Sequence, residues 1–212
     1  MRRRQLLTGA LAATAAFHPR VSHASHISTR GTVLLVPLRT FPADLCDAVE
    51  ALLVAQLNVR VERADPQPLP QLAYHPPRRR YRADKLLDHL LAVLPKERPE
   101  LRALGLTTVD ISTTKGRMAD WGVFGLGLMP GRACVVSSHR LQRGARDREH
   151  LAFRVATTAL HEVGHTLGLD HCAEARCPMQ DAGGGIENTD SSLAELGPGC
   201  RAVLDALHPA RG

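Results

Sequence analysis

The chain has 212 residues, of which 44% are hydrophobic but only 3% aromatic, so one domain with an aliphatic core is expected. Its formal charge of +6 includes Arg2, Arg3, Arg4 and Arg20, and the other 23 basic and 21 acidic residues leave a net charge of +2. This near-neutral body argues against nucleic acid as a partner, and no run of about 18 apolar residues predicts a stable membrane span in the mature chain.

Residues 1–24 have the features of an export signal. The basic stretch Arg2–Arg4 precedes a weakly apolar run, Leu6–Phe17, and Ser22–Ala24 offers a small-x-small cleavage site. The paired arginines resemble a twin-arginine signal, and the Sec route is the alternative. We therefore expect export to a bacterial periplasm or the extracellular space. The alternative is an uncleaved extension on a cytoplasmic protein.

The first half of the body alternates between strand and helix patterns. Short aliphatic runs predict buried strands, and leucines at helical spacing predict amphipathic helices. This alternation predicts an open sheet with right-handed crossovers. The expected elements are a strand Thr32–Leu38, a helix Pro42–Gln56, a strand Asn58–Arg63, a proline-rich loop Pro66–Pro77, a helix Ala83–Leu94 and a strand Leu104–Ser112.

Two further extended runs follow, Trp121–Leu128 and Ala133–Ser137. Gly122, Gly125 and Gly127 weaken the first run as a core strand. Glycine within a strand can instead mark the close approach of another backbone. A buried helix that begins near Leu151 is then expected to lead into the most informative stretch of the chain.

That stretch, His161–His171, reads H-E-x-x-H-x-x-G-x-x-H. Residues four apart share one face of a helix, so His161 and His165 can bind the same zinc ion. Gly168 suits a left-handed helix end that returns the chain and delivers His171 as third ligand. Three protein ligands leave a position for water, as in catalytic rather than structural zinc sites.

Glu162 follows the first ligand and is the expected general base. Zinc lowers the pKa of bound water towards about 7, and Glu162 can take its proton and pass it to the leaving amine. The expected activity is zinc-dependent hydrolysis of peptide bonds. The alternatives are a zinc hydrolase that acts on another acyl bond, and a catalytically weak or inactive zinc-binding module that binds peptides. The presence of Glu162 favours an enzyme.

The extended motif is that of the metzincins, and the residues after it resemble the archaemetzincin pattern C-x4-C-x-M, followed by 17 residues and C-x-x-C. Cys172, Cys177, Met179 and Cys200 match this pattern, whereas Gly197 replaces the first cysteine of the last pair. Softer similarities cover most of the chain after its first thirty residues. They are Tyr81–Leu87, Gly105–Ile111, Val123–Gly125 and Val135–Leu141.

This resemblance implies an α/β (α+β) metzincin-like fold, with a mixed twisted sheet, an antiparallel edge strand and an active-site helix. We expect a single domain, residues 25–212, with a smaller C-terminal subdomain from about residue 169. Met179 would form the Met-turn, an apolar floor beneath the histidines. The edge strand would pair with the peptide substrate, and the candidate residues are Gly122, Val123, Phe124 and Gly125. A glycine-loosened core strand is the alternative.

The five cysteines divide into two sets. Cys46, in a predicted helix, and Cys134, in a predicted strand, are expected to be small buried residues. The resemblance implies a second, structural zinc held by four cysteines, of which Cys172, Cys177 and Cys200 fill three positions. A nearby His or Asp, such as His208, could supply the fourth ligand. Water could fill the gap, or a disulfide could replace the metal.

Overall fold

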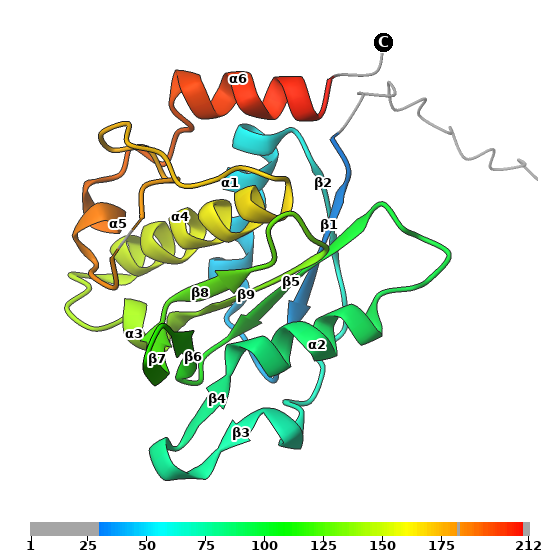
Figure 1. Cartoon of the computed structure of the whole chain (residues 1–212), viewed down its shortest axis with the longest axis vertical. Coiled ribbons are helices and arrows are strands. Elements are labelled where there is room, and N and C mark those ends of the chain that lie inside the picture. The colour runs from blue at the N-terminus through cyan, green and yellow to red at the C-terminus, as the bar shows by residue number, and fades with distance from the viewer. Residues whose placement is uncertain (1–29, 182, 210–212) are drawn as a thin grey trace, which may run out of the picture.

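The structure, a computed structural model, describes residues 30–181 and 183–209 (Figure 1). The predicted export signal, residues 1–24, lies outside the described residues. Two sheets and the helices that pack on them make up this part of the chain. The domain limits 25–212 and the subdomain boundary near residue 169 remain predictions.

The larger sheet has five strands in the order β2-β1-β5-β9-β8. Four of them are parallel, and β8 pairs antiparallel with β9 at the edge. The central strands are buried on both faces, which explains their nearly continuous aliphatic sequences. The strands are β1 (Thr32–Pro37), β2 (Arg60–Arg63), β5 (Leu101–Thr107), β8 (Gly125–Gly127) and β9 (Ala133–Ser137).

The smaller sheet has four strands in the order β3-β4-β6-β7. Two short 3-10 helices, η1 (Gln71–Ala73) and η2 (Pro76–Arg78), flank its first strand within the proline-rich segment. The strands are β3 (Tyr74–His75), β4 (Arg80–Arg82), β6 (Ile111–Lys115) and β7 (Met118–Val123).

Helices cover both faces of the larger sheet (Figure 1). Alternate residues of β9 show this: Cys134 and Val136 pack with α1 (Ala43–Leu57) and α4 (Arg148–Thr166), whereas Ala133 and Val135 pack with α2 (Ala83–Val93). Three further helices are α3 (Ser138–Leu141), α5 (Glu187–Ser191) and α6 (Pro198–Leu207). Of the helices described, none has the length and hydropathy needed to cross a bilayer.

The prediction of one strand over Leu104–Ser112 is wrong. Strand β5 ends at Thr107 in the larger sheet, and β6 begins at Ile111 in the smaller one. The Thr107 hydroxyl accepts a hydrogen bond from the Val109 N–H, 3.4 Å away, and so supports the turn between the two strands. The sequence does not reveal this break because Thr107, Thr108 and Val109 are β-branched residues typical of strands.

The predicted extended run Trp121–Leu128 is also two strands in two sheets. It changes sheet at Phe124, between β7 and β8, where the Phe124 carbonyl accepts from the Ser137 N–H at 2.8 Å. The antiparallel edge strand expected from the resemblance is therefore the three-residue β8. Cys46 in α1 and Cys134 in β9 are buried, as predicted.

Candidate metal centre and active site

Helix α4 contains His161, Glu162 and His165, and its two ends are fixed by local contacts. The Asp147 side chain caps the first turn by accepting from the His150 N–H at 2.7 Å. At the other end Gly168 has φ +92°, a conformation that costs a glycine little, and the chain turns back there. His161 and His165 consequently share one face of the helix, and His171 returns from the following loop.

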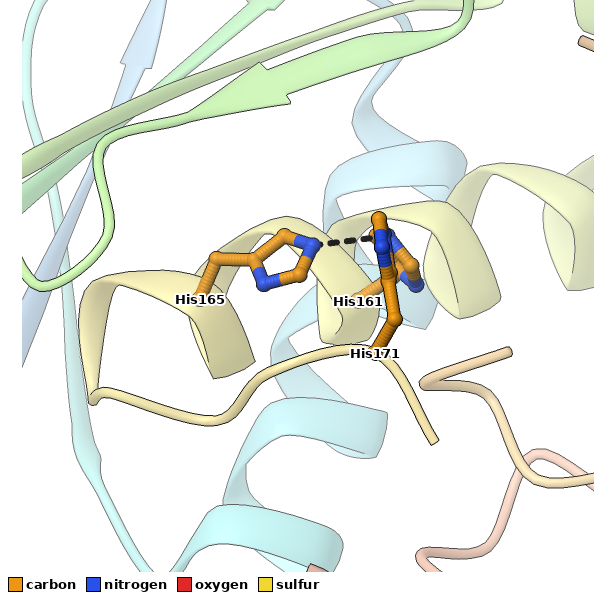
Figure 2. Close-up of side chains that lie close together, drawn as sticks. All are labelled: His161, His165 and His171. Atoms are coloured by element: carbon orange, nitrogen blue, oxygen red, sulfur yellow. Dashed lines mark hydrogen bonds between the residues drawn. The ribbon is translucent and has the colours of Figure 1, made fainter. Parts of the chain in front are cut away.

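The three histidines converge on one point (Figure 2). Their candidate ligand nitrogens all lie within 4.8 Å of one another. The Nε2 atoms of His161 and His165 are 2.9 Å apart, and the ring of His171 has its centroid 5.2 and 4.8 Å from theirs. This arrangement can hold a single metal ion.

Backbone carbonyls fix the orientation of two of these rings. The Nδ1 atom of His161 lies 2.7 Å from the Pro178 oxygen, and that of His165 lies 2.7 Å from the Leu169 oxygen. A carbonyl only accepts hydrogen bonds, so each Nδ1 carries a proton and donates it. Within the described part of the chain, His171 has no such carbonyl partner; Asp170 accepts from its backbone N–H instead, at 2.7 Å.

The donor set fits a cation. Burial lowers the pKa of His161 to about 4 and also lowers that of His165, so both rings are neutral at pH 7. With Nδ1 protonated, each neutral ring presents a lone pair at Nε2. Two lone pairs that face each other at 2.9 Å repel unless a positive charge lies between or beside them. Neutral imidazole nitrogens held by backbone carbonyls are favourable zinc ligands.

Glu162 is buried against β8, and this contact explains two of the glycines noted in the sequence. A Cβ atom at Gly125 would lie 2.6 Å from Glu162 Oε1, and one at Gly127 would lie 2.7 Å from the Glu162 carbonyl oxygen. Only glycine allows β8 to approach the helix so closely. Burial raises the pKa of Glu162 to about 8.

A cleft of about 470 Å³ surrounds these groups. Its walls come from α4 and the loop after it, from β6, β7 and β8, and from the segment after Met179. Thr157 was not predicted, although it lies four residues before His161 on the same helix face. Asp181 and Asn188 belong to a segment without a motif and could not be found from the sequence. The lining residues include Thr157, His161, Glu162, His165, His171, Trp121, Asp181 and Asn188.

The four residues predicted for the substrate edge all line this cleft, but they belong to different strands. Gly122 and Val123 end β7 and pair with β6, Phe124 lies at the change of sheet, and Gly125 begins β8. Gly122 also leaves space for Arg140, because a Cβ atom there would lie 2.1 Å from the Arg140 Cζ.

Met179 lies beneath the helix turn between the two ligand histidines. It is fully buried, and a Cβ atom at Gly164 would lie 2.7 Å from its sulfur. Its carbonyl oxygen accepts from the Cys172 N–H at 3.0 Å. The residue therefore connects the floor of the histidine cluster to the cysteines.

The cysteines predicted to group together form a second cluster. The sulfur atoms of Cys172, Cys177 and Cys200 lie within 4.8 Å of one another, and no pair forms a disulfide. Cys172 directly follows His171 in the chain, so one loop serves both clusters. His208 is not part of this group: its Nε2 donates to the Leu167 carbonyl at 2.8 Å.

Comparison with known proteins agrees with this geometry. Residues 48–206 match the model of peptidase family M54. The archaemetzincin of Natronomonas pharaonis is 32% identical over 152 residues, which cover 68% of this chain and 83% of that protein. The archaemetzincin of Thermococcus kodakarensis is 31% identical over 183 residues, which cover 81% of this chain and 94% of that protein.

Solved structures confirm the predicted metzincin-like fold. The crystal structure of archaemetzincin from Methanopyrus kandleri has a TM-score of 0.72 and 29% identity, and the match covers 87% of this chain and 98% of that one. A zinc-dependent peptidase from Methanocorpusculum labreanum has a TM-score of 0.68 and 27% identity, covering 81% and 99% of the two chains. The chain therefore belongs to peptidase family M54, the family of the archaemetzincins, and is a zinc metallopeptidase.

Proposed function

We propose that this peptidase cleaves peptide bonds at the histidine cluster, with Glu162 as the residue that carries the proton. The observation that supports this most strongly is the placement of a buried carboxyl group in the same cleft as three convergent imidazoles. A group that moves a proton during hydrolysis must lie within reach of the attacking water and of the leaving amine.

His161, His165 and His171 would hold the zinc ion. When bound, zinc supplies Lewis-acid chemistry, because it acidifies water and polarises a carbonyl group. The positive charge of the ion would favour the ionised form of Glu162. That carboxylate would accept the proton of the attacking water and return it to the amine that leaves. The contact with β8 keeps the carboxyl group buried and oriented, so its position is fixed before substrate binds.

The substrate is an extended peptide that pairs with the edge of the larger sheet. Strand β8 is antiparallel to β9 and ends that sheet among the described residues. Its outer edge lies along the cleft, next to Glu162. Backbone pairing along the edge of β8, from Gly125 to Gly127, would hold the scissile bond near the histidines.

The test is cleavage of a peptide library by the zinc-loaded protein and by Glu162→Gln. Loss of a general acid–base group lowers kcat by about 10²–10⁴-fold, while zinc content should stay unchanged. Glu149→Gln makes the same substitution at an exposed position in the first turn of α4 and serves as the matched control. If Glu162→Gln and the wild type are equally inert while both retain zinc, the proposed hydrolysis at the histidine cluster fails.

We also propose that the protein is exported. The support is the basic, apolar and small-residue pattern of residues 1–24. Sequencing the N-terminus of protein recovered from the periplasm should give Ser25 as the first residue. Replacing Arg3 and Arg4 with lysines keeps the charge, and its effect separates the twin-arginine route from the Sec route. Retention of the intact chain in the cytoplasm would contradict export.

A further inference from the structure

The cysteine cluster has three donors for a metal that usually takes four. The sulfurs of Cys177 and Cys200 are 3.8 Å apart, and Cys172 completes a group within 4.8 Å. Structural zinc sites are almost always four-coordinate. Among the described residues, no histidine, aspartate or glutamate has a donor atom within 4.8 Å of all three sulfurs as the side chains stand.

A carboxylate occupies the space where a fourth side chain would project. A Cβ atom built on Gly197 would lie 1.6 Å from Glu174 Oε2, and one on Gly199 would lie 2.5 Å from Glu174 Oε1. The two glycines therefore make room for Glu174 at the start of α6. The Gly199 N–H donates to Glu174 Oε1 at 2.8 Å and holds the carboxylate there.

The backbone of Glu174 also forms a hydrogen bond within the cysteine loop. Its carbonyl accepts from the Cys177 N–H at 3.2 Å. The Gly197 N–H in turn donates to the Cys177 sulfur at 3.4 Å. Glu174, Cys172 and Cys200 border a common hollow of about 280 Å³. The loop that presents two thiols thus presents the carboxylate to the same space.

We propose that Glu174 is the fourth ligand of a zinc ion held by Cys172, Cys177 and Cys200. Carboxylate oxygen is an ordinary zinc donor, and the three thiols release their protons when the ion binds. Three thiolates and one carboxylate carry the same charge as four thiolates. A neutral histidine or a water molecule in the fourth position would not supply the fourth negative charge. Because Glu174 stands outside the group of three sulfurs, its side chain would have to rotate away from the Gly199 N–H to bind the ion.

This site is separate from the hydrolysis proposed at the histidines, so the two can fail independently. The test loads the full chain with Co²⁺ in place of zinc. Sulfur-to-cobalt charge-transfer absorption reports the cysteine site alone, because the histidine site offers no sulfur. Total metal is measured on the same samples.

The wild type should bind two metal equivalents. Glu174→Ala should weaken binding at the cysteine site by about tenfold or more, since loss of even an outer partner costs 10–100-fold, and should shift the visible cobalt bands. Glu174→Ala combined with Gly197→Cys should restore affinity, with charge-transfer absorption raised in the ratio of four thiolates to three. Glu195→Ala, an exposed position in the same segment, is the matched control and should change nothing.

Two results would overturn the assignment. One is unchanged affinity and an unchanged cobalt spectrum in Glu174→Ala. The other is a wild type, purified under reducing conditions, that binds metal only at the histidines; mass spectrometry would then show whether two of the cysteines form a disulfide. The peptidase activity of every variant is recorded separately, so loss of the second metal is not confused with failure of hydrolysis.

Discussion

The histidine cluster and the cysteine cluster are built in different ways. Two of the three histidines lie on a long helix, and backbone carbonyls at 2.7 Å hold both of their rings. The cysteines come from a loop and from the first turn of α6, and the segment 178–196 separates these two parts. Both donor sets lie within 4.8 Å, but the histidines depend on one helix and the loop after it, whereas the cysteines join two separate segments. We therefore expect the histidine ion to serve catalysis and the cysteine ion to hold the loop against α6.

The largest expected difference between the clusters concerns activity. His165→Ala removes a ligand from the catalytic ion, and peptide cleavage should fall by at least about 10³-fold as that metal is lost. Cys177→Ser should instead lower the melting temperature and change kcat/KM by less than about tenfold. Activity and metal content measured on both variants test this. Equal losses of activity in the two variants would contradict the division of roles.

A smaller loss of activity is expected from the contact between β8 and the helix. In Gly127→Ala the new methyl group would lie 2.7 Å from the Glu162 carbonyl oxygen, so strand or helix must move. A shift of about 1 Å at a reacting group can cost about 10²-fold in rate. Gly116→Asn is the control, because its φ of +58° suits asparagine and no atom lies within 4 Å of the added Cβ. Wild-type kcat/KM in Gly127→Ala would show that the close approach is not needed.

The smallest expected effect lies at the joint between α4 and α5. The guanidinium of Arg154, which is 3% exposed, binds Asp190 at 2.6 and 2.7 Å. Asp190→Asn leaves this cation without its partner, and should cost about 2 kcal/mol of unfolding free energy because Asp190 itself is partly exposed. Urea denaturation of the two proteins measures the difference.

The same pair predicts a dependence on pH. The hydrogen bond from Arg154, and then that from His150, lowers the pKa of Asp190 below its usual value of 3.8. The folded state therefore binds this proton less readily than the unfolded chain does. The contribution is present above pH 4 and is lost as the pH falls through the lowered pKa. Asp190→Asn should reduce the acid sensitivity of stability, and an unchanged acid transition would contradict the assignment.

Local patterns in the sequence predicted the parts of the molecule whose partners are near in the chain. Helices α1 and α2, strand β9 and the convergence of His161 and His165 follow from residue spacing alone. The glycines of β8 were noticed, but their partner, Glu162, could not be named because only the tertiary fold brings that backbone to them. Glu174 lies between Cys172 and Cys177 in the sequence, but its contact with Gly197 and Gly199 depends on the tertiary fold and could not be predicted.

Because His171 and Cys172 are neighbours in the chain, the two proposed metal sites share one short stretch of backbone. The first ion to bind would restrict this stretch and lose its conformational entropy. The second ion would bind a stretch that is already restricted, and so would not lose that entropy again. Occupancy of either centre should therefore tighten the other, and by thermodynamic reciprocity the factor is the same in both directions. Zinc should therefore bind the histidines less tightly in Cys177→Ser than in the wild type, while kcat/KM at saturating zinc changes little.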